Sequence, residues 1–126
     1  MNASLNLLGR ILLAVIFLVS GYGKIAGAAG TAAYFGQMGF PAPLVVAYLV
    51  GAFELLGGIA IVLGWQMRAV GIVFALFCVA TALLAHTGDQ IAFMKNLAMA
   101  GGFLVLAGSG ATGLALDKPK RESRYA

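Results

Sequence analysis

The chain has 126 residues, of which 62% are hydrophobic and 10% are charged, and its formal net charge is +4. A soluble domain of this size carries about 25% charged residues, so the composition excludes a water-covered globular surface and indicates an integral membrane protein. The positive charge does not indicate a nucleic-acid partner, because four of the eight basic residues lie in the last nine positions. A basic segment beside an apolar one is typical of a topology signal and of contact with anionic lipid.

Four segments are long and apolar enough to cross a bilayer, which takes roughly 20 predominantly apolar residues. They cover residues 5–25, 43–65, 69–85 and 97–116. The sequence therefore predicts an all-α membrane protein, a four-transmembrane-helix bundle in residues 1–116. The first segment has features of a signal peptide, but it is long for a signal core, which favours a retained span.

Residues 117–126 read DKPKRESRYA and are predicted to form a basic cytoplasmic tail. With four spans, both ends of the chain and the 65–68 turn lie on the same side of the membrane. That side holds Arg10, Arg68, Lys118, Lys120, Arg121 and Arg124, whereas the other side holds Lys24 and Lys95. Because cytoplasmic loops are enriched in Lys and Arg, both termini are expected in the cytoplasm.

The linker at residues 31–43 is more apolar than a solvated loop. Its large apolar side chains are Tyr34, Phe35, Met38 and Phe40. We predict a short helix that lies on the outer membrane face and is ended by Gly39 and Pro41. An ordered loop packed on the end of the bundle is the alternative.

Glu54 is the most unusual residue of the spans. It lies in VGAFELLGGIA, and no Lys, Arg, Asp or His lies within ten residues of it on either side. An ionised carboxylate at membrane depth is costly, so Glu54 should face the bundle interior and have a partner, or stay protonated. Lys24 is the first candidate partner, followed by His86 and Asn96.

The predicted topology places polar groups of all four spans toward the outer half of one bundle. Those groups are Lys24, Glu54, His86, Lys95 and Asn96. One interpretation is a polar pocket in which Glu54 donates or accepts a proton and the other four residues bind a ligand. The other is a buried ion pair or hydrogen bond that fixes helix register. Asp89 and Lys95 also fit a solvated outer-loop pair.

Other polar residues and motifs are given structural interpretations. Arg10 and Arg68 lie near helix ends, where their long stems allow the charges to reach the headgroups. A metal site is not expected, because there is one His, one Cys and no ligand spacing. Cys78 allows neither an internal disulfide nor a CxxC pair. No phosphate-binding or hydrolase motif is found.

Four stretches in order along the chain resemble the DoxX family. They are GRILLAVIFLVSGYGK, MGFPAP, FELLGGIAIVLGW and KNLAMAGGFLVLA, within residues 5–113. The resemblance implies a small bacterial or archaeal inner-membrane protein with four transmembrane helices. It also implies a link to quinone, thiol or oxidative-stress redox systems. It carries over to Lys24, Glu54, Lys95 and Asn96, which stand in the matching stretches, and less closely to His86.

Three functions are consistent with these residues. The first is a quinone-linked redox subunit, in which Phe53, Phe74, Phe77 and Phe93 wall a pocket for the ring. The second is a non-catalytic scaffold that recruits a soluble or membrane redox or detoxification enzyme. The third is a small-molecule or proton transporter, less favoured because no inverted repeat or broken helix is evident. Pairs of small residues four apart, such as Ala98 and Gly102, also leave a homo-oligomer open.

Overall fold

Every regular element within residues 2–118, the part that this computed structural model describes, is a helix. The elements are α1 (Ala3–Ala26), α2 (Ala28–Gln37), α3 (Pro43–Leu63), α4 (Met67–Ala85) and α5 (Gln90–Ser109). All but α2 are long and apolar enough to cross a membrane. The predicted all-α fold with four spans and a short helix after the first is therefore confirmed. Residues 119–126 of the predicted tail lie outside the described residues.

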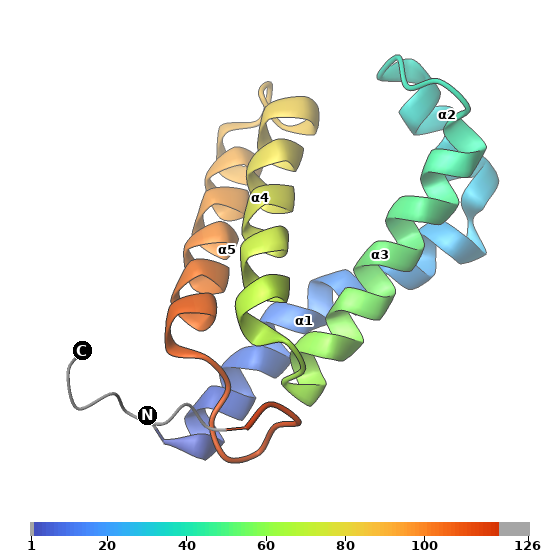
Figure 1. Cartoon of the computed structure of the whole chain (residues 1–126). Coiled ribbons are helices and arrows are strands. Elements are labelled where there is room, and N and C mark those ends of the chain that lie inside the picture. Colours follow the sequence, from blue (N-terminus) through green and yellow to red (C-terminus); the bar gives the residue numbers. More distant parts are fainter. Residues whose placement is uncertain (1, 119–126) are drawn as a thin grey trace.

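The long helices form two antiparallel pairs, α1 with α3 and α4 with α5 (Figure 1). The pairs converge at the end that holds the N-terminus of α1, the α3–α4 turn and residues 110–117, which we call the closed end. They diverge toward the end that holds α2 and the α4–α5 turn, which we call the open end. The predicted bundle therefore has the shape of a V, with α2 beside the open-end half of α3.

The α1–α3 pair is held at short range by glycines. A Cβ on Gly21 would lie 2.6 Å from the backbone N of Leu55 and 2.8 Å from the carbonyl O of Gly51. A Cβ on Gly51 would lie 3.1 Å from the carbonyl O of Gly21. Small residues let two helices approach closely in lipid, where packing replaces the hydrophobic effect as the driving force. This contact sets the distance between the two helices that carry Lys24 and Glu54.

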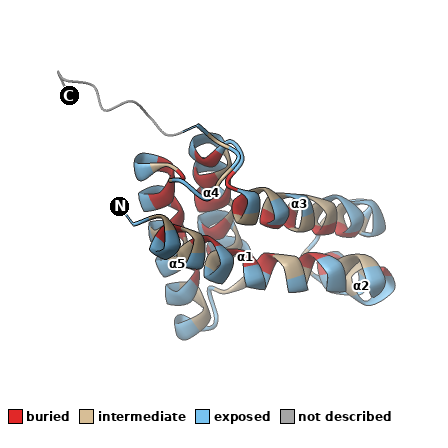
Figure 2. Cartoon of the chain, turned by 90° about the horizontal axis from the view of Figure 1, so that it is seen from below, coloured by how far each residue is buried: buried red, intermediate tan, exposed pale blue. Residues whose placement is uncertain are grey.

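The buried residues follow the arrangement of the helix pairs. Buried residues gather on the helix faces that meet within and between the pairs, and the outward faces are exposed (Figure 2). Large apolar side chains occupy those outward faces, among them Leu12, Leu56 and Leu104. Such surfaces are unfavourable in water and match the hydrocarbon of a bilayer.

The fourth long helix, α5, begins and ends earlier than the predicted span of 97–116. Asp89 caps its N-terminus, where the Oδ1 atom accepts a hydrogen bond from the Ala92 N–H at 3.1 Å. Gly110, at a φ of 75°, ends the helix in a conformation that glycine adopts readily. Hydropathy misses both boundaries, because the cap is polar and residues 110–116 are still mostly apolar. Asn96 consequently lies well inside α5 rather than at its start.

The structure also corrects the prediction for Arg10, whose charged group is buried inside the protein. Its side chain is 1% exposed. Its Nε donates to Asn6 Oδ1 at 2.9 Å, its Nη1 donates to the carbonyl O of Val62 at 2.7 Å, and its Nη2 donates to the carbonyl O of Leu114. The guanidinium is buried because residues 110–117 fold back over the closed end, a contact that the sequence pattern does not reveal.

Asp117 completes this closed-end clamp. Its carboxylate accepts hydrogen bonds from the backbone N–H groups of Gln66 at 2.7 Å and Met67 at 2.8 Å, at the N-terminus of α4. Its own N–H donates to the carbonyl O of Gly64 at 2.9 Å. A carboxylate at a helix N-terminus satisfies free N–H groups and complements the helix dipole. Residues 110–117 thus connect α1, α3 and α4 at the closed end.

Candidate functional site: an intramembrane cavity

A cavity of about 370 Å³ lies between the two helix pairs, toward the open end. All five helices contribute to its walls, and the wall surface is mainly apolar. Along α3 it extends from Val46 to Glu54, eight residues and therefore about 12 Å of helix. The cavity therefore follows about two turns of α3.

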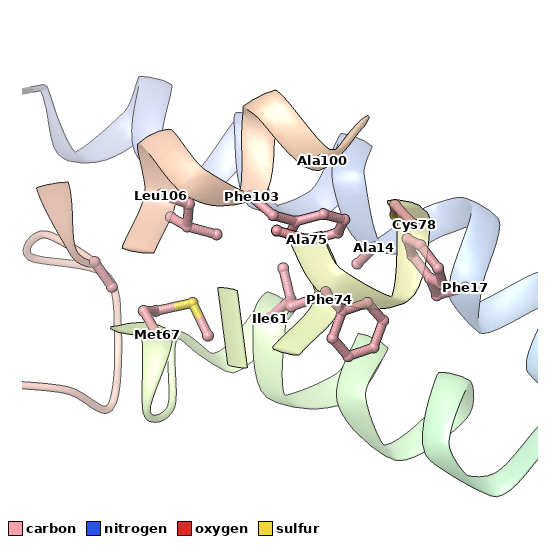
Figure 3. Close-up of a cluster of buried hydrophobic side chains, with 11 residues drawn as sticks. Ala14, Phe17, Ile61, Met67, Phe74, Ala75, Cys78, Ala100, Phe103 and Leu106 are labelled. Atoms are coloured by element: carbon pink, nitrogen blue, oxygen red, sulfur yellow. The ribbon is translucent and has the colours of Figure 1, made fainter. Parts of the chain in front are cut away.

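Phenylalanine side chains form the floor of the cavity. Phe17 and Phe77 line it directly. Beneath them, the Phe74 ring lies 4.7 Å from the Phe17 ring, 4.8 Å from the Phe53 ring and 5.3 Å from the Phe103 ring, measured between centroids. Figure 3 shows Phe17, Phe74 and Phe103 converging in the core. Because the four long helices each supply at least one ring, this cluster joins the two pairs and separates the cavity from the closed end.

Lys24 and Glu54 form an ion pair on the cavity wall. Lys24 Nζ lies 2.8 Å from Glu54 Oε1. Both residues line the cavity, and their side chains are 25% and 4% exposed, respectively. Lys24 lies in the last turn of α1, where a cation also complements the negative end of the helix dipole. The first candidate partner predicted for Glu54 is therefore the one observed, and the pair adjoins open space.

Asn96 and His86 also line the cavity, whereas Lys95 does not. Asn96 is 8% exposed, and its Nδ2 donates to the carbonyl O of Ala92 at 3.0 Å, so its side-chain carbonyl and second N–H remain for a ligand. His86 is half-buried at the C-terminal end of α4. Lys95 is exposed. The structure thus brings Lys24, Glu54, His86 and Asn96 around one space and leaves Lys95 outside it.

The predicted aromatic wall differs in detail. Phe77 lines the cavity, whereas Phe53 and Phe74 lie in the floor cluster and Phe93 does not line the cavity. Several lining residues are not predicted from the sequence, namely Phe17, Ser20, Tyr34, Phe35, Met38, Phe40 and Thr81. Ser20 precedes Lys24 by four residues, a spacing that places both side chains on one helix face and could have revealed it. The α2 side chains were not predictable as walls, because their position depends on how α2 packs against α3.

Among residues 2–118, no group of three or more His, Cys, Asp or Glu side chains could hold a metal ion. Cys78 is a free, buried thiol in the core. The polar chemistry described for the cavity is therefore that of one ammonium–carboxylate pair, an amide, an imidazole and three hydroxyls, those of Ser20, Tyr34 and Thr81.

The fold is that of a small multi-span membrane protein with a candidate ligand site. Its four long apolar helices surround a cavity whose wall carries an ion pair. The DoxX family model matches residues 5–87. The chain belongs to the DoxX family, as its sequence motifs predicted. No solved structure is significantly similar to it.

The relatives include two proteins of Escherichia coli (strain K12) and one of Bacillus subtilis (strain 168). "Inner membrane protein YqjF" is 38% identical over 120 residues, covering 89% of this chain and 88% of the relative. "Inner membrane protein YphA" is 34% identical over 124 residues, with 90% and 89% covered. "Putative oxidoreductase CatD" is 41% identical over 71 residues, with 56% and 52% covered. The chain is thus a DoxX-like inner membrane protein.

Proposed function

We propose that the cavity binds a quinone headgroup and that the protein is the membrane subunit of a quinone-linked redox system. The observation that carries this proposal is a mainly apolar space of about 370 Å³ with the Lys24–Glu54 pair and Asn96 on its walls. Small-molecule sites are typically pockets of roughly 300–1,000 Å³ lined by apolar and aromatic side chains, with a few polar groups that fix orientation. A quinone ring, flat and apolar with two carbonyl acceptors, matches that combination.

The residues of the cavity divide the proposed task. The Lys24 ammonium has three donor hydrogens and pairs with Glu54, so it can also donate to a ligand carbonyl while it stays beside Glu54. The free N–H of Asn96 is a second donor. Phe17 and Phe77 offer ring surfaces for packing. The Glu54 carboxyl adjoins the same space, where it can accept or release a proton.

A quinone, when bound, takes up two electrons and two protons to become a quinol. In our proposal, the Glu54 carboxyl passes protons to and from the bound quinone. The electrons come from a partner protein with a flavin or a dithiol centre, since this chain has one cysteine and no dithiol. The name of the Bacillus subtilis relative, "Putative oxidoreductase CatD", supports a redox context.

The second candidate function is a scaffold that holds a redox or detoxification enzyme at the membrane. The ion pair favours it in one respect, because Lys24 and Glu54 directly connect α1 to α3 and so stabilise that pair without any ligand. The open space beside the ion pair favours the quinone site instead, since a purely structural pair has no need of an adjoining cavity.

The two functions are separated by measuring quinone that purifies with the protein. The protein is extracted with its native lipids, and bound quinone per protein is quantified by mass spectrometry. We compare Lys24→Met with Lys95→Met, because both substitutions remove a lysine but only Lys24 lines the cavity. Glu54→Gln is measured in parallel, with thermal unfolding as the control for folding.

For a quinone site we expect quinone in the unaltered protein and in Lys95→Met. Lys24→Met should retain about one tenth as much quinone or less, because a hydrogen bond from a charged donor contributes about 1.5–3 kcal/mol. Absence of quinone from the unaltered protein, or equal losses in the two lysine variants, would reject the site. A loss of stability in Glu54→Gln with no bound quinone in any protein would favour the scaffold.

A further inference from the structure

The phenylalanine floor closes both gaps between the helix pairs at one level. On one side, α3 contacts α4 at that level: Phe53, which directly precedes Glu54, lies 5.0 Å from Phe77 between ring centroids. The same ring stacks on Phe74 at 4.8 Å. The gap between α3 and α4 is therefore filled by aromatic rings at the floor of the cavity.

On the other side, α1 and α5 meet at the same level, where the Phe17 ring lies 4.7 Å from the Phe74 ring and 6.2 Å from the Phe77 ring. Leu13 lies close to Gly102, because a Cβ added to Gly102 would lie 3.2 Å from the Cδ2 atom of Leu13. The Phe17 and Phe103 rings lie 5.6 Å apart between centroids. Phe17 precedes Lys24 by seven residues, so this contact is about 10 Å closer to the closed end than Lys24. α1 and α5 also make the smallest contact of any adjoining pair of helices.

Above that contact, Ile16 and Ser20 of α1 and Met99 of α5 line the cavity. Ile16 is nevertheless 47% exposed, so it lies at the rim of the cavity rather than inside it. It is one helical turn from Leu13 and from Ser20, and all three therefore share the side of α1 that faces α5. The cavity thus reaches the protein surface at Leu84 in the last turn of α4, which lines it and is 62% exposed, and also at Ile16 in the gap between α1 and α5.

This gap lies at the depth of the hydrocarbon. Ile16 and Met99 are near the middle of α1 and α5, each of which is long and apolar enough to span a membrane. The nearby outward residue Val19 is 68% exposed, as expected for a lipid-facing side chain. A molecule dissolved in the bilayer meets the rim at Ile16 without passing through water.

We infer that the cavity takes its ligand laterally from the bilayer between α1 and α5, and that the ligand is a quinone with a long apolar tail. This inference rests on the proposed quinone site. A space of about 370 Å³ is near the lower end for small-molecule pockets and suits a ring system without a long tail. The head then lies beside Lys24 and Asn96, and the tail leaves past Ile16 and Met99 into lipid.

The test compares two ligands and two variants in lipid nanodiscs. One ligand is a prenylated naphthoquinone, and the other is a methylated naphthoquinone without a tail. Ile16→Trp fills the rim, whereas Val19→Trp adds the same ring to a lipid-facing position on the same helix that does not line the cavity. Equilibrium dissociation constants are measured for each combination, with thermal unfolding to verify that each variant is folded.

We expect Ile16→Trp to weaken binding of the prenylated ligand by about tenfold or more, as an overfilled contact does. Binding of the tailless ligand should change by less than about threefold, and Val19→Trp should leave both unchanged. Equal weakening of both ligands, or none, would overturn lateral entry while leaving the quinone site in place. If neither ligand binds the unaltered protein, the proposed function itself is rejected. Met99→Trp repeats the test from α5 if Ile16→Trp does not fold.

Discussion

Lys24 and Glu54 both connect two helices and line the cavity of this membrane protein. The pair has a short contact of 2.8 Å and a nearly buried carboxylate, yet it lines an open cavity. A buried pair is stabilising mainly in the sense that removing one partner leaves the other charge uncompensated. The ion pair is therefore both a connection between α1 and α3 and the polar group that a ligand would meet.

A double-mutant cycle tests this coupling. Lys24→Met and Glu54→Met should each lower the free energy of unfolding by about 3 kcal/mol, since each leaves an unpaired charge at membrane depth. The double variant should be less destabilised than the sum of the two, with a coupling of about 1–3 kcal/mol. Denaturant unfolding in detergent micelles measures all four proteins. Additive losses would mean that the two charges do not stabilise each other.

At the scale of the elements, the packing of α1 on α3 depends on glycines that bring two backbones together. Gly21 lies in α1 opposite backbone atoms of α3, whereas Gly23, two residues further, has nothing within 4 Å of an added Cβ. A backbone atom cannot move aside as the end of a side chain can. The spacing of glycines in the sequence suggests close packing, but it does not identify which glycine faces the partner helix.

Gly21→Ala should therefore lower the free energy of unfolding by about 1–3 kcal/mol, because the added methyl group overfills the α1–α3 contact. Gly23→Ala is the matched control. It should be neutral or more stable by about 0.5–1 kcal/mol, the usual gain of Ala over Gly inside a helix. The same unfolding assay measures both variants, and equal effects would contradict the observed packing of α1 on α3.

Considered as a whole, the molecule has one closed end and one open end. Arg10 and Asp117 hold α1, α3, α4 and residues 110–117 together at the closed end. The phenylalanine cluster separates this end from the cavity. The cavity is thus blind toward the closed end, which favours a binding site over a continuous pathway through the molecule.

The importance of the clamp is tested by Arg10→Met against Arg68→Met. Arg10→Met should lower the free energy of unfolding by about 3 kcal/mol, because it removes the charged donor to the carbonyl groups of Val62 and Leu114 and to Asn6. Arg68 is exposed, so its replacement should change stability by less than about 0.5 kcal/mol. Arg10→Lys should restore only part of the loss, since a lysine lacks the planar set of donors. Similar stabilities for the two methionine variants would show that the clamp contributes little.

Four features are predictable from the sequence, namely the four apolar spans, the short helix after the first, the DoxX family and the isolated acid at Glu54. These features follow from composition, segment length and local order, which do not depend on which faces meet. The sequence also predicts Lys24 as the partner of Glu54, because few charged groups exist at membrane depth and their number limits the choice.

The packing of the helices sets which residues share the cavity, and it places Lys95 outside. It also decides that Arg10 is buried, that α5 ends at Ser109 and that the helix pairs diverge at one end. In membrane helices nearly every face is apolar, so hydropathy cannot distinguish a face that meets lipid from one that meets protein. That distinction depends on glycine contacts, aromatic packing and the return of residues 110–117, which bring together positions far apart in the sequence.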